Sequence, residues 1–327
     1  MAFKTRITEM LGIEHPVVQG GMQWVGTAEM ASAVSNAGGL GILTALTQPT
    51  PAALAAEIAR CRTMTAKPFG VNITVFPTIN APDYKAYAQA ALDGGIRIFE
   101  TAGTPAVREI WEMIRPHGVK ILHKCTAVRH ALSSEKAGVD VISIDGFECA
   151  GHPGEDDIGL IVLLPATVDA VDVPVIASGG MADGRSLVAA LALGADGVNM
   201  GTRFCATVEA KIHENVKRQI VEFNERDTVL VGRTLRNTAR VARNAVSEKV
   251  VEIQQDPTKT FDDVREYMAG VRGRENVLRD GDMDGGIWTT GQSQALIHDI
   301  PTCAELVGNI MGQANSIIRE RLAGIAA

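Results

Sequence analysis

The feature that most constrains this chain is the regular alternation of short apolar runs with helix-length amphipathic stretches over residues 16–204. Apolar runs with few polar interruptions are typical of strands that are buried on both faces of a parallel sheet. The predicted strands are Pro16–Gln19, Gly39–Leu43, Phe69–Ile73, Arg97–Glu100, Lys120–His123, Val139–Ile144, Pro174–Ala177 and Gly197–Met200. Eight strands that alternate with helices predict a closed (β/α)8 barrel, the TIM barrel of the α/β class.

The alternation ends near Phe204, and residues 206–290 are richer in charge and contain no further strand–helix unit. We interpret this stretch as a smaller, mostly helical insertion or lid domain over the barrel mouth. The barrel then comprises residues 1–205 and 291–327, and the helical pattern of Gln292–Leu322 closes it from outside. Barrels of this class often carry insertions, so one chain of 327 residues accommodates this arrangement.

Charge and cysteine usage exclude several function classes. The formal net charge is −7, whereas nucleic-acid phosphates require clustered Lys and Arg, so we predict no nucleic-acid partner. The five cysteines are widely spaced without a C-x-x-C motif, which predicts neither a metal site nor a disulfide framework. No apolar stretch reaches the roughly 20 residues that a membrane span needs. The N-terminal residues also lack an apolar signal core, so we expect a cytoplasmic protein.

The loops after the last two strands predict a phosphate site. Ser178, Gly179 and Gly180 follow the seventh strand, and Gly201 and Thr202 follow the eighth. In TIM barrels these two loops often bind phosphate. Glycines let backbone N–H groups approach an anion closely, and a following helix start adds partial positive charge. Ordinary turn formation is the alternative interpretation of the same glycines.

Three other strand ends supply candidates for contacts with a flat redox ring. Gly21, Met22 and Gln23 follow the first strand, where a glycine permits close approach of a ring, although a plain strand exit explains them too. Asn72 lies in the third strand and can both donate and accept hydrogen bonds at a ring edge or nitro group. Lys124 follows the fifth strand, where a cation favours electron uptake by a flavin; a surface salt bridge is the alternative.

The loop after the sixth strand carries the candidate for proton transfer. His152 lies between Gly151 and Pro153, which frame it within a tightly folded loop. Histidine titrates near neutral pH and is the commonest proton-transfer group, so we predict that His152 is catalytic rather than structural. The three acidic residues at 155–157 lack matched His or Cys spacing, so we interpret them as a solvated loop or helix cap.

Two further features have more than one interpretation. The loop after the third strand contains Pro77 and Asn80, and we assign it to the substrate or NADH, with an ordinary loop as the alternative. Arg236, Arg240 and Arg243 recur at helical spacing and predict one basic helix face. We expect these arginines to pair with acidic residues of a neighbouring helix, and contact with dinucleotide phosphates is the alternative.

Six runs of sequence resemble the nitronate monooxygenase family, formerly called 2-nitropropane dioxygenases. They are QGGMQWVG at 19–26, HKCTAVRHA at 123–131, DGFECAGHPGEDD at 145–157, ASGG at 177–180, NMGTRF at 199–204 and RNTARVARN at 236–244. The resemblance covers nearly the whole chain and implies a TIM-barrel oxidoreductase that binds FMN non-covalently. It implies FMN contacts at Gly21, Met22, Gln23, Asn72, Lys124, Asp145, Gly151, Ser178, Gly179, Gly180, Gly201 and Thr202. By the same match, His152 corresponds to the family's active-site histidine.

The resemblance leaves more than one reaction open. Our first hypothesis is a nitronate monooxygenase, which oxidises alkyl nitronates or nitroalkanes with O2 to carbonyl compounds and nitrite. The alternative is an NADH:quinone reductase, because a bacterial branch with that activity shares the proline-containing loop and the RNTARVARN run. A third hypothesis is a non-redox, aldolase-like phosphate-binding barrel with Lys124 as a Schiff-base lysine. The partner is a small molecule in each case, and the oligomeric state stays open, with a homodimer among the alternatives.

Overall fold

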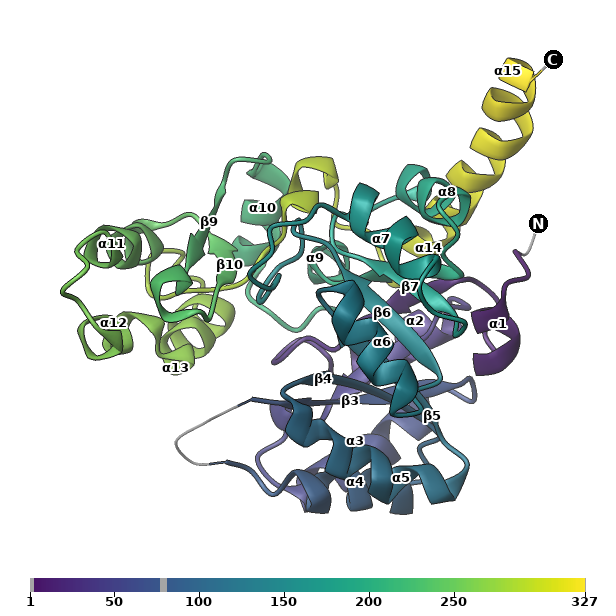
Figure 1. The fold of residues 1–327 in the computed structure, drawn as a ribbon, viewed down its shortest axis with the longest axis horizontal. Coiled ribbons are helices and arrows are strands. Elements are labelled where there is room, and N and C mark those ends of the chain that lie inside the picture. The colour runs from purple at the N-terminus through teal and green to yellow at the C-terminus, as the bar shows by residue number, and fades with distance from the viewer. Residues whose placement is uncertain (1–2, 77–80, 327) are drawn as a thin grey trace.

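The computed structural model describes residues 3–76 and 81–326 and confirms the predicted TIM barrel (Figure 1). Its parallel strands are β1 (Val17–Gln19), β2 (Gly41–Thr44), β3 (Phe69–Val75), β4 (Ile98–Gly103), β5 (Lys120–Cys125), β6 (Val141–Asp145), β7 (Val175–Ser178) and β8 (Gly197–Met200). The eight strands follow one another around the sheet, and β1 pairs with β8. A parallel bridge between Val18 and Leu40 joins β1 to β2 and closes the barrel.

Helices surround the barrel on its outside. They are α2 (Ala28–Asn36), α3 (Pro51–Met64), α4 (Tyr84–Asp93), α5 (Arg108–Ile114), α6 (Val128–Lys136), α7 (Leu160–Val168), α8 (Gly184–Ala192) and α14 (Cys303–Ser316). The last of these, α14, packs against α8 and α2 and takes the place of the helix that would follow β8. The C-terminal residues continue from α14 as η7 (Ile317–Leu322) and α15 (Ala323–Ala326), which project from the body (Figure 1).

The interior of the barrel changes from apolar to polar along the strands. At the N-terminal end, α1 (Arg6–Leu11) packs Ile7 and Leu11 against the inward-facing side chains of Val18, Leu40, Ile42, Ile98, Leu122, Val141 and Ile176. Toward the C-terminal end, the buried residues include Gln19, Asn72, Glu100, Ser143 and Asn199. Since buried polar groups need partners, this polar end marks the part of the barrel that carries a site.

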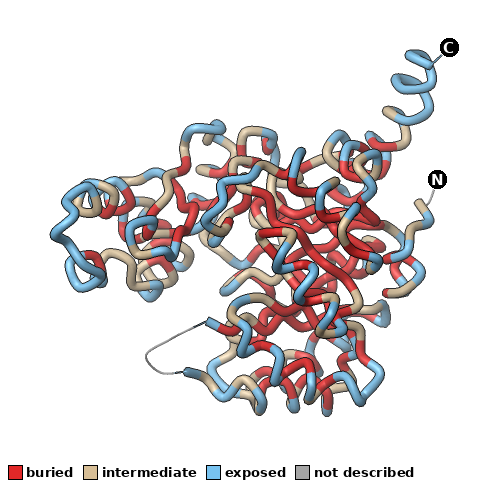
Figure 2. The backbone as a smooth tube through the Cα atoms, in the orientation of Figure 1, coloured by how far each residue is buried: buried red, intermediate tan, exposed pale blue. Residues whose placement is uncertain are grey.

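Residues 206–290 contain helices and one hairpin. The helices are α10 (Glu214–Glu222), the 3-10 helix η4 (Arg233–Leu235), α11 (Ala245–Gln254), α12 (Phe261–Met268), α13 (Gly270–Arg272) and the π-helix η5 (Gly273–Arg279). Strands β9 (Thr228–Val231) and β10 (Ala239–Ala242) form the antiparallel hairpin. Figure 2 shows buried backbone concentrated in the barrel, with more exposed backbone along the helices of this segment.

The hairpin overturns the predicted basic helix face. Arg240 lies on β10, Arg236 adopts a left-handed backbone conformation with φ of 50°, and Arg243 follows the strand. The β-branched Val241 pairs with Val229 across the hairpin, and this preference for a strand outweighs the helix-like arginine spacing. The three arginines therefore do not share a helix face.

None of the described helices is long and apolar enough to cross a membrane. All five cysteines are free thiols.

Candidate functional site

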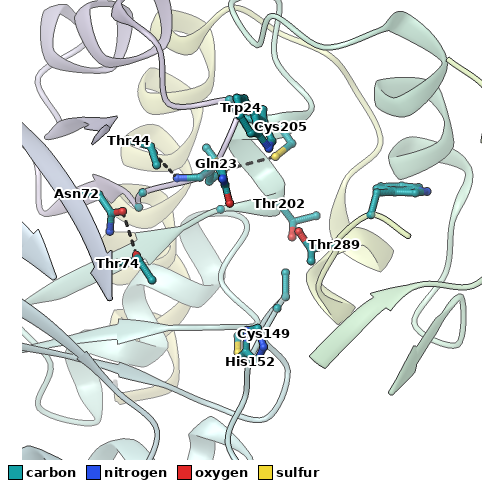
Figure 3. A pocket seen from close by; sticks show the side chains of 18 of the residues that line it. Gln23, Trp24, Thr44, Asn72, Thr74, Cys149, His152, Thr202, Cys205 and Thr289 are labelled. Atoms are coloured by element: carbon teal, nitrogen blue, oxygen red, sulfur yellow. Dashed lines mark hydrogen bonds between the residues drawn. The ribbon is translucent and has the colours of Figure 1, made fainter. Parts of the chain in front are cut away.

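One cavity of about 770 Å³ lies at the C-terminal ends of the strands, lined by both the barrel and residues 206–290. All the predicted site residues that the structure describes line it, namely Gly21, Met22, Gln23, Asn72, Lys124, Asp145, Gly151, His152, Ser178, Gly179, Gly180, Gly201 and Thr202. Figure 3 shows Gln23, Asn72, His152 and Thr202 around the same space, although they come from distant parts of the chain. Pro77 and Asn80 lie outside the described residues.

The turn after β1 requires glycine because its backbone lies in direct contact with buried polar side chains at the C-terminal end of the barrel. A Cβ atom on Gly21 would lie 2.3 Å from Cγ of Asn72, and one on Gly20 would lie 2.4 Å from Oδ1 of Asn199. Both contacts are too close for any real side chain. The backbone N–H of Gly21 instead donates to Oε2 of Glu100 at 2.7 Å. The turn is therefore anchored from below by a carboxylate.

Sequence reasoning missed Glu100, which does not line the cavity but holds three of the residues that do. Its side chain is fully buried, and its Oε2 also accepts a hydrogen bond from Nδ2 of Asn72 at 2.8 Å. Its Oε1 accepts one from Nδ2 of Asn199 at 2.9 Å. One carboxylate on β4 therefore joins β3, β8 and the turn after β1. The sequence did contain a signal for this role, because Glu100 ends a predicted apolar strand. Acidic residues are almost never fully buried without partners, so an acidic residue at such a position predicts a buried hydrogen-bond network.

Lys124 forms a partly buried ion pair at the next strand ends. Its Nζ donates to Oδ1 of Asp145 at 3.0 Å and to Oγ of Ser178 at 3.3 Å. Burial disfavours the positive charge, but the carboxylates of Asp145 and Glu100 outweigh it and raise the pKa of Lys124. The amine therefore stays protonated at neutral pH. This argues against the Schiff-base hypothesis, because a nucleophilic lysine needs a lowered pKa.

The loops after β7 and β8 present backbone donors to the cavity. Gly179 and Gly180 adopt left-handed conformations, with φ of 85° and 73°, which glycine adopts without steric cost. In the described part of the chain, the N–H groups of these two residues and of Gly201 donate no hydrogen bond. The start of α8 is capped by the Asp183 side chain, which accepts from the N–H groups of residues 185 and 186. Loop N–H groups, rather than that helix start, are therefore available for an anion.

The histidine loop is held by the hairpin of residues 206–290. Gly151 and Arg240 form an antiparallel bridge, with N–H to carbonyl distances of 3.0 and 2.6 Å. The Arg240 guanidinium donates to the carbonyl of Phe147 at 2.9 Å and lies over its ring, 4.7 Å from the centroid. Arg240 also donates to the hydroxyl of Thr228 and pairs with no acidic residue in the described part of the chain, so for this arginine both the predicted helix and the predicted acidic partner were wrong. Arg243 does pair with an acidic residue of a neighbouring helix, Glu248 of α11, at 3.2 Å.

His152 lies on the cavity wall with its ring 4.9 Å from the ring of Phe76. Desolvation by the surrounding protein lowers the pKa of His152, and the charge of Glu155 and a hydrogen bond with Asn237 only partly offset this. The imidazole is therefore neutral at neutral pH, the form that accepts a proton.

The acidic residues that follow His152 pair with neighbouring side chains. Asp156 contacts Arg129 at 2.6 Å, and Asp157 contacts Arg233 at 2.7 Å.

Residues 206–290 supply a second, apolar side of the cavity. We call this side the apolar wall, and it consists of Ile212, Val216, Ile220, Leu278, Ile287 and Trp288. Val216, Ile220 and Trp288 are each at most 5% exposed, so they are core side chains that also face the cavity. Arg274 also lines the cavity, and its guanidinium lies 4.6 Å from the ring centroid of Trp24. The cavity thus has a polar side at the strand ends and an apolar side beneath α10.

Sequence comparison relates the chain to oxidoreductases along most of its length. The sequence model of a family described as nitronate monooxygenase matches residues 4–313. A Mycobacterium tuberculosis protein, (3aS,4S,5R,7aS)-5-hydroxy-7a-methyl-1-oxo-octahydro-1H-indene-4-carboxyl-CoA dehydrogenase, is 33% identical, and the match covers 95% of this chain and 96% of that protein.

Solved structures agree with this relation. FabK from Thermotoga maritima superposes with a TM-score of 0.90 at 34% identity, covering 99% of each chain. A nitroalkane oxidase from Streptomyces ansochromogenes gives a TM-score of 0.79 at 27% identity, covering 95% of this chain and 99% of that one. The named dehydrogenase and oxidase act on unlike substrates, so the common element is the barrel and its oxidoreductase chemistry.

Proposed function

Because the chain belongs to the nitronate monooxygenase family of flavin-dependent oxidoreductases, we propose that it binds FMN and reduces a quinone with electrons from NADH. The observation that carries this proposal is the two-sided cavity of about 770 Å³. This volume lies within the roughly 300–1,000 Å³ of ligand pockets, and a short alkyl nitronate beside a cofactor would cover little of the apolar wall. Its apolar wall suits the ring or side chain of a quinone.

The polar side fits FMN on the contacts of its own residues. The N–H groups of Gly179, Gly180 and Gly201 have no partner within the described protein, so they would hold the phosphate. Glycine at position 21 lets the turn lie directly on Asn72, where a Cβ atom would clash, and the turn, which lines the cavity, would face the flat ring. The protonated Lys124 would lie near the ring and favour its reduced, anionic form.

FMN, when bound, would supply a two-electron carrier between the donor and the acceptor. NADH gives up two electrons and one proton, and a quinone takes these with one further proton from solvent to become a quinol. The protein's own residues orient the reactants and exclude water from the cavity. The neutral His152 is placed to hold or transfer a proton at its ring nitrogen.

Nitronate oxidation with O2 to a carbonyl compound and nitrite is the second candidate. A neutral His152 on the cavity wall favours it, because such an imidazole can accept the α-proton of a neutral nitroalkane. The family description and the likeness to a nitroalkane oxidase give further support. This reaction gives the apolar wall little to do, so we place it second.

Anaerobic stopped-flow spectroscopy on the FMN-loaded enzyme separates the two candidates. We expect NADH to bleach the flavin absorbance rapidly and a quinone to restore it. No bleaching with NADH, together with bleaching by propyl-2-nitronate, contradicts the reductase and supports the monooxygenase. A purified protein without releasable flavin contradicts both.

We also propose the division of the chain into a barrel of residues 1–205 and 291–327 and a lid domain of residues 206–290. A cytoplasmic location and the oligomeric state stay predictions.

A further inference from the structure

The apolar wall is built like a binding surface rather than an accidental gap. Val216 and Ile220 lie one turn apart on α10, so their side chains share one face of the helix. Both are about 1% exposed and both line the cavity. The indole of Trp288 lies beside them and is backed by the ring of Phe223, which stacks on it at 6.0 Å. This support from behind keeps the wall in shape.

The chemistry of this wall selects one kind of ligand group. The described residues that form it carry hydrocarbon side chains or an indole, and none carries a charge. Among these six residues the only polar side-chain atom is the indole Nε1 of Trp288, which is buried and has no hydrogen-bond partner in the described part of the chain. A charged group placed elsewhere on the wall would lose its water without gaining a partner. An alkyl group would instead gain from the removal of apolar surface from water. The wall is also continuous with the polar side of the same cavity, so one substrate can reach both.

We propose that the apolar wall is a subsite for the alkyl or isoprenoid side chain of the quinone acceptor. The half-buried Ile212, Leu278 and Ile287 present its surface, and the volume of Val216 and Ile220 behind them sets the length that the subsite accepts. The inference rests on the proposed reductase function and names the substrate class of that same site. The quinone ring lies toward the strand ends, and its side chain runs beneath α10. Short-chain and long-chain quinones therefore differ in how much of this wall they bury.

The test uses FMN-loaded enzyme, NADH and benzoquinones whose single n-alkyl side chain lengthens from methyl to decyl. We expect kcat/KM to rise by about two- to fourfold for each methylene that enters the subsite, and then to level off when the wall is covered. In Val216→Phe, the ring fills the subsite, so the ratio of decyl to methyl kcat/KM should fall at least tenfold below that of the unmodified enzyme.

Val208→Phe is the matched control, because Val208 is exposed and does not line the cavity. It should keep the chain-length profile of the unmodified enzyme. If Val216→Phe fails to fold, the double variant Val216→Ala and Ile220→Ala enlarges the subsite and should move the plateau to longer chains. Equal profiles in Val216→Phe and Val208→Phe, or an unmoved plateau in the double alanine variant, overturn the proposal.

Binding measured without turnover separates this proposal from the reductase function. Trp24 and Trp288 both line the cavity, so the measurement uses the Trp24→Phe background, in which Trp288 is the one tryptophan among the described residues of the cavity lining. Alkyl quinones should quench its emission with an affinity that rises with chain length, and adding Trp288→Phe should remove that quenching. If NADH fails to bleach the flavin while length-dependent quenching persists, the reductase function is wrong and the subsite stands. If NADH bleaches the flavin but quenching does not depend on chain length, the subsite is wrong and the reductase stands.

Discussion

The two sides of the cavity are built by different physics. At the strand ends, directional hydrogen bonds of 2.7–2.9 Å join the Glu100 carboxylate to groups from three other parts of the barrel. Beneath α10, the apolar wall is held by packing, which tolerates changes of similar volume. The contrast agrees with the proposal that a cofactor of fixed shape binds the polar side and a variable substrate binds the apolar wall. Substitutions on the polar side should therefore lower the affinity for FMN, and substitutions on the apolar wall should change kcat/KM for the substrate.

The largest expected effect comes from a change at His152, which lies on the cavity wall and belongs to neither the Glu100 network nor the apolar wall. In the second candidate reaction, nitronate oxidation, His152→Asn should lower turnover of neutral nitroalkanes by about 100-fold or more, because general-base catalysis contributes roughly 10²–10⁴-fold. FMN affinity should change far less. The control is His117→Asn, an exposed histidine away from the cavity. Steady-state kinetics and fluorimetric FMN titration measure the two quantities, and unchanged turnover removes the proposed role.

The pH dependence of the same reaction sharpens this test. The pKa of His152 is lowered by desolvation, so its neutral form persists below the usual histidine value of about 6.5. Activity that needs the neutral imidazole should therefore be constant at neutral pH and fall as the pH drops through an apparent pKa below that value. A pH–rate profile of kcat/KM that instead falls above pH 7 would argue for a protonated His152.

The next effect tests the hydrogen-bonded side. Glu100→Gln replaces an acceptor oxygen with an amide donor, which leaves at least one of the three donors around it without a partner. A buried unsatisfied group costs about 1–3 kcal/mol, so we expect roughly that loss of stability and at least a tenfold loss of FMN affinity. Denaturant unfolding and FMN titration measure both. The exposed Glu222→Gln on α10 is the control, and equal behaviour of the two variants contradicts the assigned role of Glu100.

The smallest effect tests the glycine turn. Gly21→Ala places a Cβ against the buried Asn72, and overpacking of this kind costs about 1–3 kcal/mol. We expect FMN affinity to fall about tenfold through displacement of the turn. Gly308→Ala in α14 is the control, since nothing lies within 4 Å of its added Cβ and alanine favours a helix. FMN affinity in Gly308→Ala equal to that in Gly21→Ala would show that the turn does not shape the site.

Much of the fold was predictable because it depends on local patterns. The apolar runs identified all eight strands, since strands buried on both faces are apolar throughout. The described site residues then converged on one cavity because the ends of parallel strands meet at one edge of a barrel.

The features that sequence reasoning missed depend on distant contacts. Glu100 becomes significant only when Gly21 and Asn199 are brought beside it across the barrel. The apolar wall escaped notice for a similar reason, because Val216 and Ile220 have the pattern of ordinary core positions on an amphipathic helix. Arg240 was assigned to a helix because Arg236, Arg240 and Arg243 recur at helical spacing. Its observed hydrogen-bond partner, the carbonyl of Phe147, is far away in sequence and could not be found from that spacing.

The bridge between Gly151 and Arg240 has a consequence for the construction of chimaeras. If residues 206–290 set substrate preference as proposed, exchanging them between relatives should transfer that preference, and it would also give the histidine loop a new neighbour. A donor segment without an arginine at the position of Arg240 would leave the Phe147 carbonyl without its guanidinium partner. A chimaera should therefore take the histidine loop and the β9–β10 hairpin from the same relative, so that the bridge between Gly151 and Arg240 is kept.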